Sequence, residues 1–306
     1  MRGRMLHEVS GDTHLLPYGQ RDDELIYSVS RADLNCILID VAEQKFGVNF
    51  HFEHAVTRYD NREHVVHFRN GTDNYEMHAD ALLVTDGAGS LIRRAYAKDS
   101  VINPSESLLP HGYKELLIPP RTGGGFELDE AALHIWPRSD FLLIALPNPG
   151  GDFTLTLFMP NEGQNSFAAL QDGDVEAFFR EHFADVAPLI ANLGSTWEKN
   201  PVGILGTVRC EHWHDEDRFL LIGDAAHAIV PFHGQGMNLA FEDCVLLDEL
   251  VGDQAEPDWS VIFAEYEARQ LANANAIAAI GISTTAQSSA SVGIRRVLIR
   301  TTTTCR

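Results

Sequence analysis

Residues 218–238, with the sequence RFLLIGDAAHAIVPFHGQGMN, decide the fold of this chain. The apolar run at 219–222 predicts a buried strand that delivers Gly223 and Asp224 to its carboxyl end, where open α/β sheets bind ligands. Gly223 allows a tight turn, and the Asp224 carboxylate can accept hydrogen bonds from a polyol or a ribose. The Gly-Gln-Gly triplet at 234–236 begins a predicted helix, whose first N–H groups favour negative charge on a ligand. We therefore predict a ligand-binding strand–loop–helix; the alternative is a tight connection that binds nothing.

The chain before this segment also predicts α/β structure. Runs typical of strands lie at residues 24–30, 48–52, 64–68, 75–78 and 81–85. The last run is almost continuously apolar, as expected for a strand inside a parallel sheet. Apolar residues recur at helical spacing across 31–46, which predicts a helix that Ser30 can cap.

The middle of the chain has a different pattern. Short apolar or alternating runs, separated by Pro and Gly turns, lie at residues 111–118, 132–136, 141–147 and 153–159. They predict an antiparallel sheet, and helical patterns follow over 174–194 and 258–278. The order is therefore α/β, then mostly β, then α/β again. This order predicts a nucleotide-binding type of domain that is interrupted by a smaller sheet domain.

Charge and composition exclude several classes of protein. The chain has 306 residues, of which 44 are acidic and 23 are Lys or Arg, so its formal net charge is −21. This charge argues against a nucleic-acid backbone or an anionic membrane as the main partner. The four cysteines are widely spaced, which disfavours a zinc site or a disulfide framework. No apolar run predicts a transmembrane helix. Residues 281–306 differ from the rest because they contain no acidic residue and many Ser and Thr.

Several motifs together resemble one enzyme family. The segment 218–238 is similar to the second FAD-binding motif of the aromatic-ring flavoprotein monooxygenases. The similarity is most specific to the members that hydroxylate L-kynurenine. It also includes SVSRADLN (28–35), TDGAGSLIRRAY (85–96), PHGYKEL (110–116), LHIWPR (133–138), IALPN (144–148), FTLTLFMP (153–160) and GQGMNLAFEDC (234–244). PHGYKEL and LHIWPR are far more specific than the GD and DG dipeptides that the wider class shares.

The resemblance implies an α/β fold in which an incomplete, Rossmann-like FAD-binding domain is interrupted by a smaller, mostly antiparallel substrate domain and followed by helices. The expected parts are a partial FAD-binding domain (1–103), the substrate domain (104–205), the return of the FAD-binding domain (206–280) and a disordered, non-family tail (281–306). The implied cofactor is FAD, with NADPH as co-substrate. The implied reaction is the hydroxylation of L-kynurenine by O2 to 3-hydroxykynurenine. No metal and no nucleic acid are implied.

The resemblance assigns the cofactor contacts to Arg31, Val56, Asp86, Asp224, Gly236, Met237 and Asn238. Asp224 matches the aspartate that binds the ribityl chain of the flavin, and the helix start at 236–238 matches the segment beside the isoalloxazine ring. The charge of Arg31 suits the pyrophosphate, and Val56 matches a backbone contact near the adenine. Asp86 belongs to a DG element that the class uses around the pyrophosphate and for NAD(P)H.

Two of these cofactor contacts have simpler alternatives. Arg31 can be a solvent-exposed arginine at the start of a helix. Asp86 can form an Asx-type turn that ends a strand, with Arg93 and Arg94 exposed on the helix that follows.

The resemblance assigns the substrate contacts to four residues. Arg4 and Tyr18 match the arginine and tyrosine that hold the carboxylate of the amino acid, which suits a guanidinium fork and a phenol. Phe232 and His233 match residues beside the substrate ring, where an aromatic wall fits an anthraniloyl group. The alternative for Arg4 is a solvated N-terminal segment. His233 can act in proton transfer or be a packed, hydrogen-bonded histidine.

Other histidines have simpler interpretations. His227 is expected to be structural. The spacing of His212 and His214 permits a metal site, but their loop is acidic and offers no further partner, so we expect none.

Two features of the family have no counterpart in this sequence. The GxGxxG fingerprint that binds the FAD pyrophosphate is not found, so we expect roughly the first eighty residues of the family pattern to be absent. The family's asparagine–tyrosine pair after Ile280 is also not found, so residues 281–306 are expected to be foreign to it. The hypotheses are therefore a kynurenine hydroxylase or a truncated form of one, a non-catalytic remnant without FAD affinity, or a hydroxylase of another aromatic acid.

Overall fold

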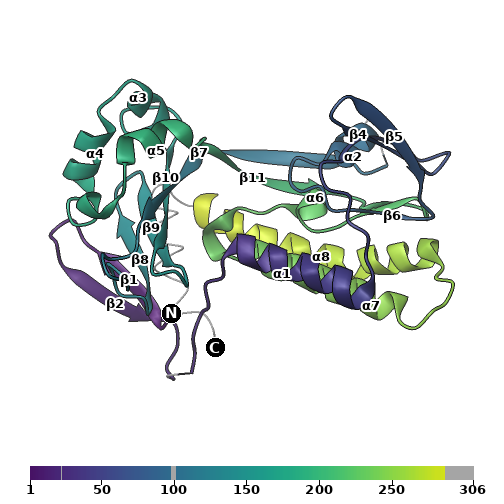
Figure 1. Cartoon of the computed structure of the whole chain (residues 1–306), viewed down its shortest axis with the longest axis horizontal. Helices are drawn as coiled ribbons and strands as arrows, with labels where there is room; N and C mark the ends of the chain where they lie inside the picture. The colour runs from purple at the N-terminus through teal and green to yellow at the C-terminus, as the bar shows by residue number, and fades with distance from the viewer. Residues whose placement is uncertain (22, 98–100, 287–306) are drawn as a thin grey trace. The chain divides into compact units, whose positions relative to one another are not determined.

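Two units make up the structure, a computed structural model that describes residues 1–21, 23–97 and 101–286 (Figure 1). The first unit consists mainly of Met1–Val48 and Leu109–Leu205, and the second consists of Asn49–Leu108 and Gly206–Ser283. The first strands therefore group with the middle of the chain, whereas the sequence assigned 1–103 to a partial FAD-binding domain. The functional meaning of these units remains a prediction.

A seven-stranded sheet organises the first unit, with the order β11-β7-β10-β9-β8-β1-β2. Strands β7 to β10 pair antiparallel, as predicted, whereas β1 pairs parallel with β8. The strands are β1 (Gly3–His7), β2 (Thr13–Pro17), β7 (Pro104–Ile118), β8 (Ala132–Pro137), β9 (Leu142–Pro147), β10 (Phe153–Pro160) and β11 (Gly203–Cys210).

Short helices cover one side of this sheet: α3 (Phe167–Gln171), α4 (Val175–His182), η2 (Ala187–Leu189) and α5 (Leu193–Lys199) (Figure 1). Their aromatic side chains, including the fully buried Phe179 and Phe183, pack against Trp136 of β8 and Phe153 of β10. Burial of apolar area on this scale is the main force that holds such a layer to a sheet.

The helix predicted over 174–194 is broken into three pieces. A proline lies at the start of η2, where its ring fits a first helical turn but cannot continue one. Asn192 then adopts a left-handed backbone with φ of 48° and starts α5 in a new direction.

The helix predicted over 31–46 is confirmed as α1 (Arg31–Phe46). Ser30 accepts a hydrogen bond from Asp33 N at its start, and Gly47 ends it with a left-handed φ of 68°. The strands predicted beside it, at 24–30 and 48–52, are wrong, because neither segment joins a ladder. The segment 24–30 exchanges backbone hydrogen bonds with Met1 only at Ile26, and one such pair does not make a strand.

Two small sheets belong to the second unit. The sheet β12-β13-β6 contains β6 (Leu82–Val84), β12 (His214–Asp215) and β13 (Phe219–Leu221). The other contains β3 (Ala55–Asp60), β4 (Val65–Asn70) and β5 (Asp73–His78). Strands β6 and β13 pair in parallel, which confirms the parallel strand predicted at 81–85. The helices are α2 (Leu91–Tyr96), α6 (Asp224–His227), η3 (Pro231–His233), α7 (Gly236–Val251) and α8 (Trp259–Ala286).

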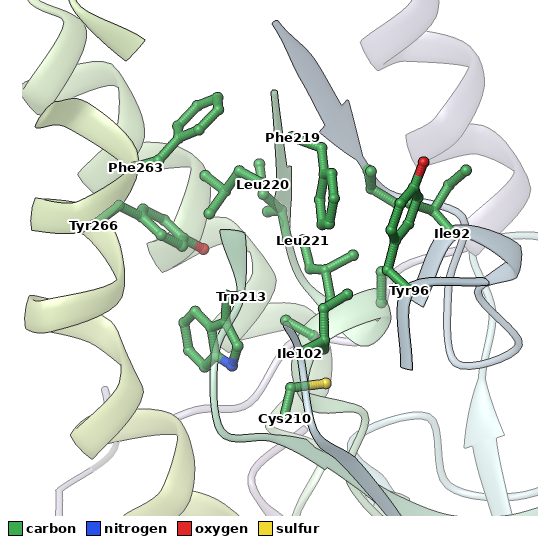
Figure 2. Packing of buried hydrophobic residues seen from close by; sticks show 14 of the residues in the cluster. Ile92, Tyr96, Ile102, Cys210, Trp213, Phe219, Leu220, Leu221, Phe263 and Tyr266 are labelled. Atoms are coloured by element: carbon green, nitrogen blue, oxygen red, sulfur yellow. The ribbon is translucent and has the colours of Figure 1, made fainter. Parts of the chain in front are cut away.

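Strand β13 lies at the centre of the core of the second unit (Figure 2). Phe219 and Leu220 point to opposite sides of it, Phe219 toward Tyr96 of α2 and Leu220 toward Phe263 of α8. The rings of Phe219 and Tyr96 have centroids 5.1 Å apart. All three residues of β13 are buried, which is what the continuous apolar run predicts.

Within the described ranges, none of the helices combines the length and apolar character that crossing a bilayer requires. Helix α8 continues past Ile280, where the family resemblance weakens, as far as Ala286. The rest of the predicted tail lies outside the described residues.

Candidate functional site

The carboxyl ends of two adjacent parallel strands carry the two predicted aspartates of the second unit. Leu221 pairs with Val84, and Ile222 N donates to Val84 O at 3.0 Å, so β6 and β13 end together. Asp86 and Asp224, just beyond these ends, are both exposed. A glycine with positive φ accompanies each one, since Gly87 has φ of 80° and Gly223 has φ of 60°. Both motifs therefore present a carboxylate at one edge of the sheet.

Asp86 has a defined structural role at this edge. Its Oδ2 accepts a hydrogen bond from Leu91 N at 2.7 Å, and Ser90 Oγ accepts one from Arg93 N at 3.1 Å. Together they cap the start of α2. This geometry fits the Asx-type alternative for Asp86, and its contact with a cofactor remains a prediction.

Arg93 is buried, with 0% exposure, and is not one of two exposed arginines as the simpler alternative expected. Its Nη1 donates to Ala225 O at 2.7 Å, and its Nη2 donates to Ala88 O and to Glu106 Oε1. One guanidinium therefore connects the loop after β6 with the short helix α6 that follows β13. Arg94 is exposed, and among the contacts described its guanidinium donates only to Gly89 O, at 2.6 Å.

Asp243 on α7 holds the turn at Gly223. Its Oδ2 accepts from Gly223 N at 2.9 Å and pairs with His227 Nε2 at 2.8 Å, and its Oδ1 accepts from Gln270 Nε2 at 2.9 Å. Burial by itself raises the pKa of Asp243, but the bonds from His227, Gln270 and Gly223 outweigh it and lower the pKa below its usual range. His227 is thus part of a structural cluster, in line with its predicted role.

The start of α7 fits a ligand that is rich in acceptors. Its N-cap residue, Gln235, makes no side-chain cap bond to the first N–H groups, and Met237 and Asn238 are exposed there. A helix of this length carries a positive end that favours an anionic ligand edge, and the exposed Asp224 carboxylate can accept bonds from a polyol chain. These groups fit the ribityl and ring portions of a flavin. The chain offers no GxGxxG loop for its phosphates.

Arg4 on β1 and Tyr18 just after β2 come together in the first unit. The Arg4 guanidinium lies over the Tyr18 ring, 4.8 Å from its centroid. Burial raises the pKa of Tyr18, although the Arg4 charge and a hydrogen bond from Arg4 act against this shift. Nε and Nη1 of Arg4 are buried and have no hydrogen-bond partner within the described structure. A half-buried arginine with two buried, unpaired donors fits a carboxylate ligand, so Arg4 does not lie in a solvated tail.

The remaining predicted contacts are placed individually. Arg31 is the exposed first residue of α1, and Val56 on β3 is 42% exposed. Phe232 is buried in η3, and His233 is the last residue of the same turn. Arg4, Tyr18 and Arg31 belong to the first unit, and the other predicted site residues belong to the second. Their roles toward a ligand remain predictions.

His212 and His214 both lie near one acidic side chain. His212 Nδ1 is 3.1 Å from Glu267 Oε1, and His214 Nε2 is 3.9 Å from Glu267 Oε2. Across the residues that the structure describes, no three His, Cys, Asp or Glu side chains group as metal ligands.

Sequence reasoning missed Asp243, Gln270 and the burial of Arg93. Asp243 lies within the quoted motif GQGMNLAFEDC, and its position on a helix with an otherwise apolar inner face is a signal of a buried carboxylate. Gln270 and the partners of Arg93 lie far away in the chain, so no local pattern indicates them.

The matches to known proteins agree with this geometry. Residues 178–272 match the FAD binding domain family. The chain is 49% identical over 280 residues to a kynurenine 3-monooxygenase of Xanthomonas campestris pv. campestris, covering 90% of this chain and 61% of the relative. It is 48% identical over 281 residues to the kynurenine 3-monooxygenase of Xanthomonas oryzae pv. oryzae, with the same coverage. The predicted resemblance is confirmed, and this chain spans about three fifths of the length of these relatives.

Solved structures show the same fold at lower identity. The tetrameric form of 2-methyl-3-hydroxypyridine-5-carboxylic acid oxygenase has a TM-score of 0.69 at 18% identity, and the match covers 90% of this chain and 71% of that one. HpxO of Klebsiella pneumoniae, solved with FAD and uric acid, has a TM-score of 0.67 at 17% identity, covering 97% and 76%. The α/β fold of FAD-dependent monooxygenases is therefore confirmed, and FAD is the cofactor that the family match supports.

Proposed function

We propose that this chain, a homologue of bacterial kynurenine 3-monooxygenases, carries FAD-binding and substrate-binding parts of an FAD-dependent aromatic hydroxylase. The proposed substrate is L-kynurenine, the co-substrates are NADPH and O2, and the product is 3-hydroxykynurenine. One observation carries the proposal most directly. The exposed Asp224 and the start of α7, which has no side-chain cap, follow the buried strand β13 within the segment that matches the FAD binding domain family.

On the cofactor side, each residue has a proposed task. Asp224 accepts hydrogen bonds from the ribityl hydroxyls, and the N–H groups at Gly236–Asn238 favour negative charge at the edge of the ring. Arg31 and Asp86 face the pyrophosphate region, and Val56 contacts the adenine side through its backbone. FAD, when bound and reduced by NADPH, supplies the oxygen chemistry.

On the substrate side, the proposed tasks are binding and orientation. Arg4 holds the substrate carboxylate through its unpaired Nε and Nη1, and Tyr18 adds one directional hydrogen bond. Phe232 is proposed to contact the aromatic ring, and His233 to exchange a proton near it. Fixed orientation of this kind lowers the entropic part of the barrier.

Titration of the purified full chain with FAD, followed by flavin fluorescence, tests the proposal. The wild-type chain should bind FAD, and Asp224→Ala should weaken binding about tenfold, as loss of one hydrogen bond to a charged group does. Asp217→Ala is the matched control, because Asp217 is an exposed aspartate before β13, at the opposite end of the same strand. A wild-type chain without FAD affinity would support the non-catalytic remnant instead.

Product analysis distinguishes a kynurenine hydroxylase from a hydroxylase of another aromatic acid. The FAD-loaded chain with NADPH should convert L-kynurenine and leave 4-hydroxybenzoate unchanged. Turnover of 4-hydroxybenzoate alone would support the alternative of a related hydroxylase with another aromatic acid.

A further inference from the structure

His7, at the end of β1, contacts three side chains that the proposed function does not use. Its Nδ1 lies 2.9 Å from Asp185 Oδ2, and its Nε2 lies 2.9 Å from His134 Nδ1. Its ring stacks on Trp136, with centroids 4.1 Å apart and an angle of 22° between the planes. Trp136 Nε1 donates to the same Asp185 oxygen at 2.7 Å. All four residues belong to the first unit, and both histidines are buried.

The outer partner of His134 determines the direction of its hydrogen bonds. His134 Nε2 lies 2.9 Å from Asp129 O, and a carbonyl oxygen only accepts, so this nitrogen carries the proton. Burial lowers the pKa of His134 below its usual value, so the ring is neutral and its Nδ1 is an acceptor. The bond between the two histidines is therefore donated by His7 Nε2.

The other nitrogen of His7 faces a carboxylate. Burial alone raises the pKa of Asp185, but the hydrogen bonds from His7 and Trp136 outweigh it and lower the pKa to about 2. The carboxylate is ionised at neutral pH and only accepts hydrogen bonds. His7 therefore lies between an ionised carboxylate and a neutral imidazole, within hydrogen-bond distance of both.

No short loop joins β1 to β8, so loop length does not fix the register in which the two strands pair. Gly3 to Leu6 pair with Ala132 to Ile135, far away in the chain, and Arg4 lies opposite Leu133. A slip by two residues keeps every side chain on its face of the sheet but moves Arg4 by about 6.6 Å. The same slip would break the hydrogen bonds of His7 with His134 and Asp185 and leave buried polar nitrogens without partners, which is costly.

We infer that the Asp185–His7–His134 network sets the register of β1 on β8 and so positions Arg4 for the substrate carboxylate. His7 is a positioning residue, since its side chain and that of Arg4 lie on opposite faces of β1. Arg138 reinforces the network, because its Nη1 donates to His7 O at 3.2 Å and its Nε donates to His182 O at 2.6 Å. Register selection is the best-attested use of buried polar groups. The part that concerns the substrate rests on the proposed function.

The first test is spectroscopic and needs no ligand. In the full chain labelled with ¹⁵N-histidine, His7 is assigned from the signal that disappears in His7→Phe. The proton between the two rings should lie on His7 Nε2, and His134 should show a single proton, on its own Nε2. A His7 Nε2 without a proton would overturn the assignment of the network.

The second test measures the register and its effect on Arg4. Amide hydrogen exchange of residues 3–7 should become about tenfold faster in His7→Phe, because the pairing of β1 with β8 loses the side-chain contacts that fix its register. Under the same conditions, the Kd for L-kynurenine should rise about tenfold. His111→Phe is the matched control, since His111 is a buried histidine on β7 of the same sheet and has no pairing with β1.

Outcomes separate the two proposals. If His7→Phe matches His111→Phe in both exchange and binding, the inference is wrong. If the wild-type chain does not bind L-kynurenine, the proposed function fails, and exchange together with the imidazole spectra still decides the inference. Asp185→Asn is a second variant in case His7→Phe does not fold, because the Asp185 side chain is 49% exposed and the amide keeps its shape. It should raise the exchange rate of residues 3–7 in the same direction.

Discussion

Replacing Asp243 tests whether the turn that presents Asp224 depends on one buried carboxylate. Asp243 has 0% exposure, and its two oxygens accept from Gly223 N, His227 Nε2 and Gln270 Nε2 at 2.8 to 2.9 Å. Asp243→Ala leaves three buried donors without an acceptor and opens a small cavity beside the turn. Each such donor is costly because it has lost water as well as its partner.

The magnitude follows from these contacts. Each buried donor left without an acceptor costs about 1–3 kcal/mol, so for three donors we expect a loss of about 4 kcal/mol in the free energy of unfolding for Asp243→Ala. Asp243→Asn can keep its oxygen toward Gly223 and His227 and directs its NH2 group at Gln270 Nε2. One hydrogen bond is then lost instead of three, which costs about 1–2 kcal/mol.

Urea unfolding of the full chain, followed by circular dichroism and tryptophan fluorescence, measures both variants. Trp213 is a local probe, because its ring centroid lies 4.9 Å from that of His227. A loss below about 1 kcal/mol in Asp243→Ala would refute the reasoning, since it would mean that the donors find new partners. Equal losses in Asp243→Asn and Asp243→Ala would refute the assignment of two bonds to one oxygen.

The pH dependence of this stability has a defined sign. The pKa of Asp243 is lower in the folded state than its ordinary value of 3.8. Its contribution to stability is therefore present above pH 3.8 and is lost as the pH falls through the folded pKa. Asp243→Asn should abolish this part of the acid sensitivity.

Three further outcomes are expected from urea unfolding. Arg93→Met should cost about 2–4 kcal/mol, because the carbonyls of Ala88 and Ala225 lose one shared, buried donor, whereas the neighbouring Arg94→Met should cost less than about 0.5 kcal/mol. Lys114→Met should cost about 1–3 kcal/mol, because Lys114 Nζ donates to Trp197 O at 2.6 Å and Asn200 O at 2.7 Å at the end of α5. Asp185→Asn should be less stable than wild type at neutral pH, and this difference should shrink as the pH falls from 3.8 through about 2, the range over which the wild-type carboxylate loses its charge. A constant difference across that range would contradict the assigned shift.

Local signals predicted the helices more reliably than the strands. Helix α1 has Ser30 at its start and Gly47 at its end, so every determinant lies within its own segment. The strands expected at 24–30 and 48–52 lacked this property, because a strand needs a partner that its own sequence does not specify. The single helix predicted over 174–194 is wrong, although a local signal was present: the proline of η2 interrupts the helix.

In the candidate site, too, some features follow from local sequence and others depend on distant parts of the chain. The strand-end positions of Asp86 and Asp224 follow from the apolar runs before them, since the ends of adjacent parallel strands share an edge. The pairing of Arg4 with Tyr18 required the hairpin of β1 and β2, although the family resemblance indicated both residues. The partners of Asp243, Arg93 and His7 had no signal in the sequence beyond their residue type.

By itself, then, the sequence determined the parallel strand pair, the long helices and the resemblance to FAD-dependent monooxygenases, since periodicity, caps and motifs act over a few residues. Only the tertiary structure decided that Arg93 is buried, that Asp243 holds the turn at Gly223 and that His7 lies between Asp185 and His134. Each of these depends on groups brought together from distant parts of the chain. A buried charge is tolerated only where the fold supplies its partners, and those partners exist only after folding.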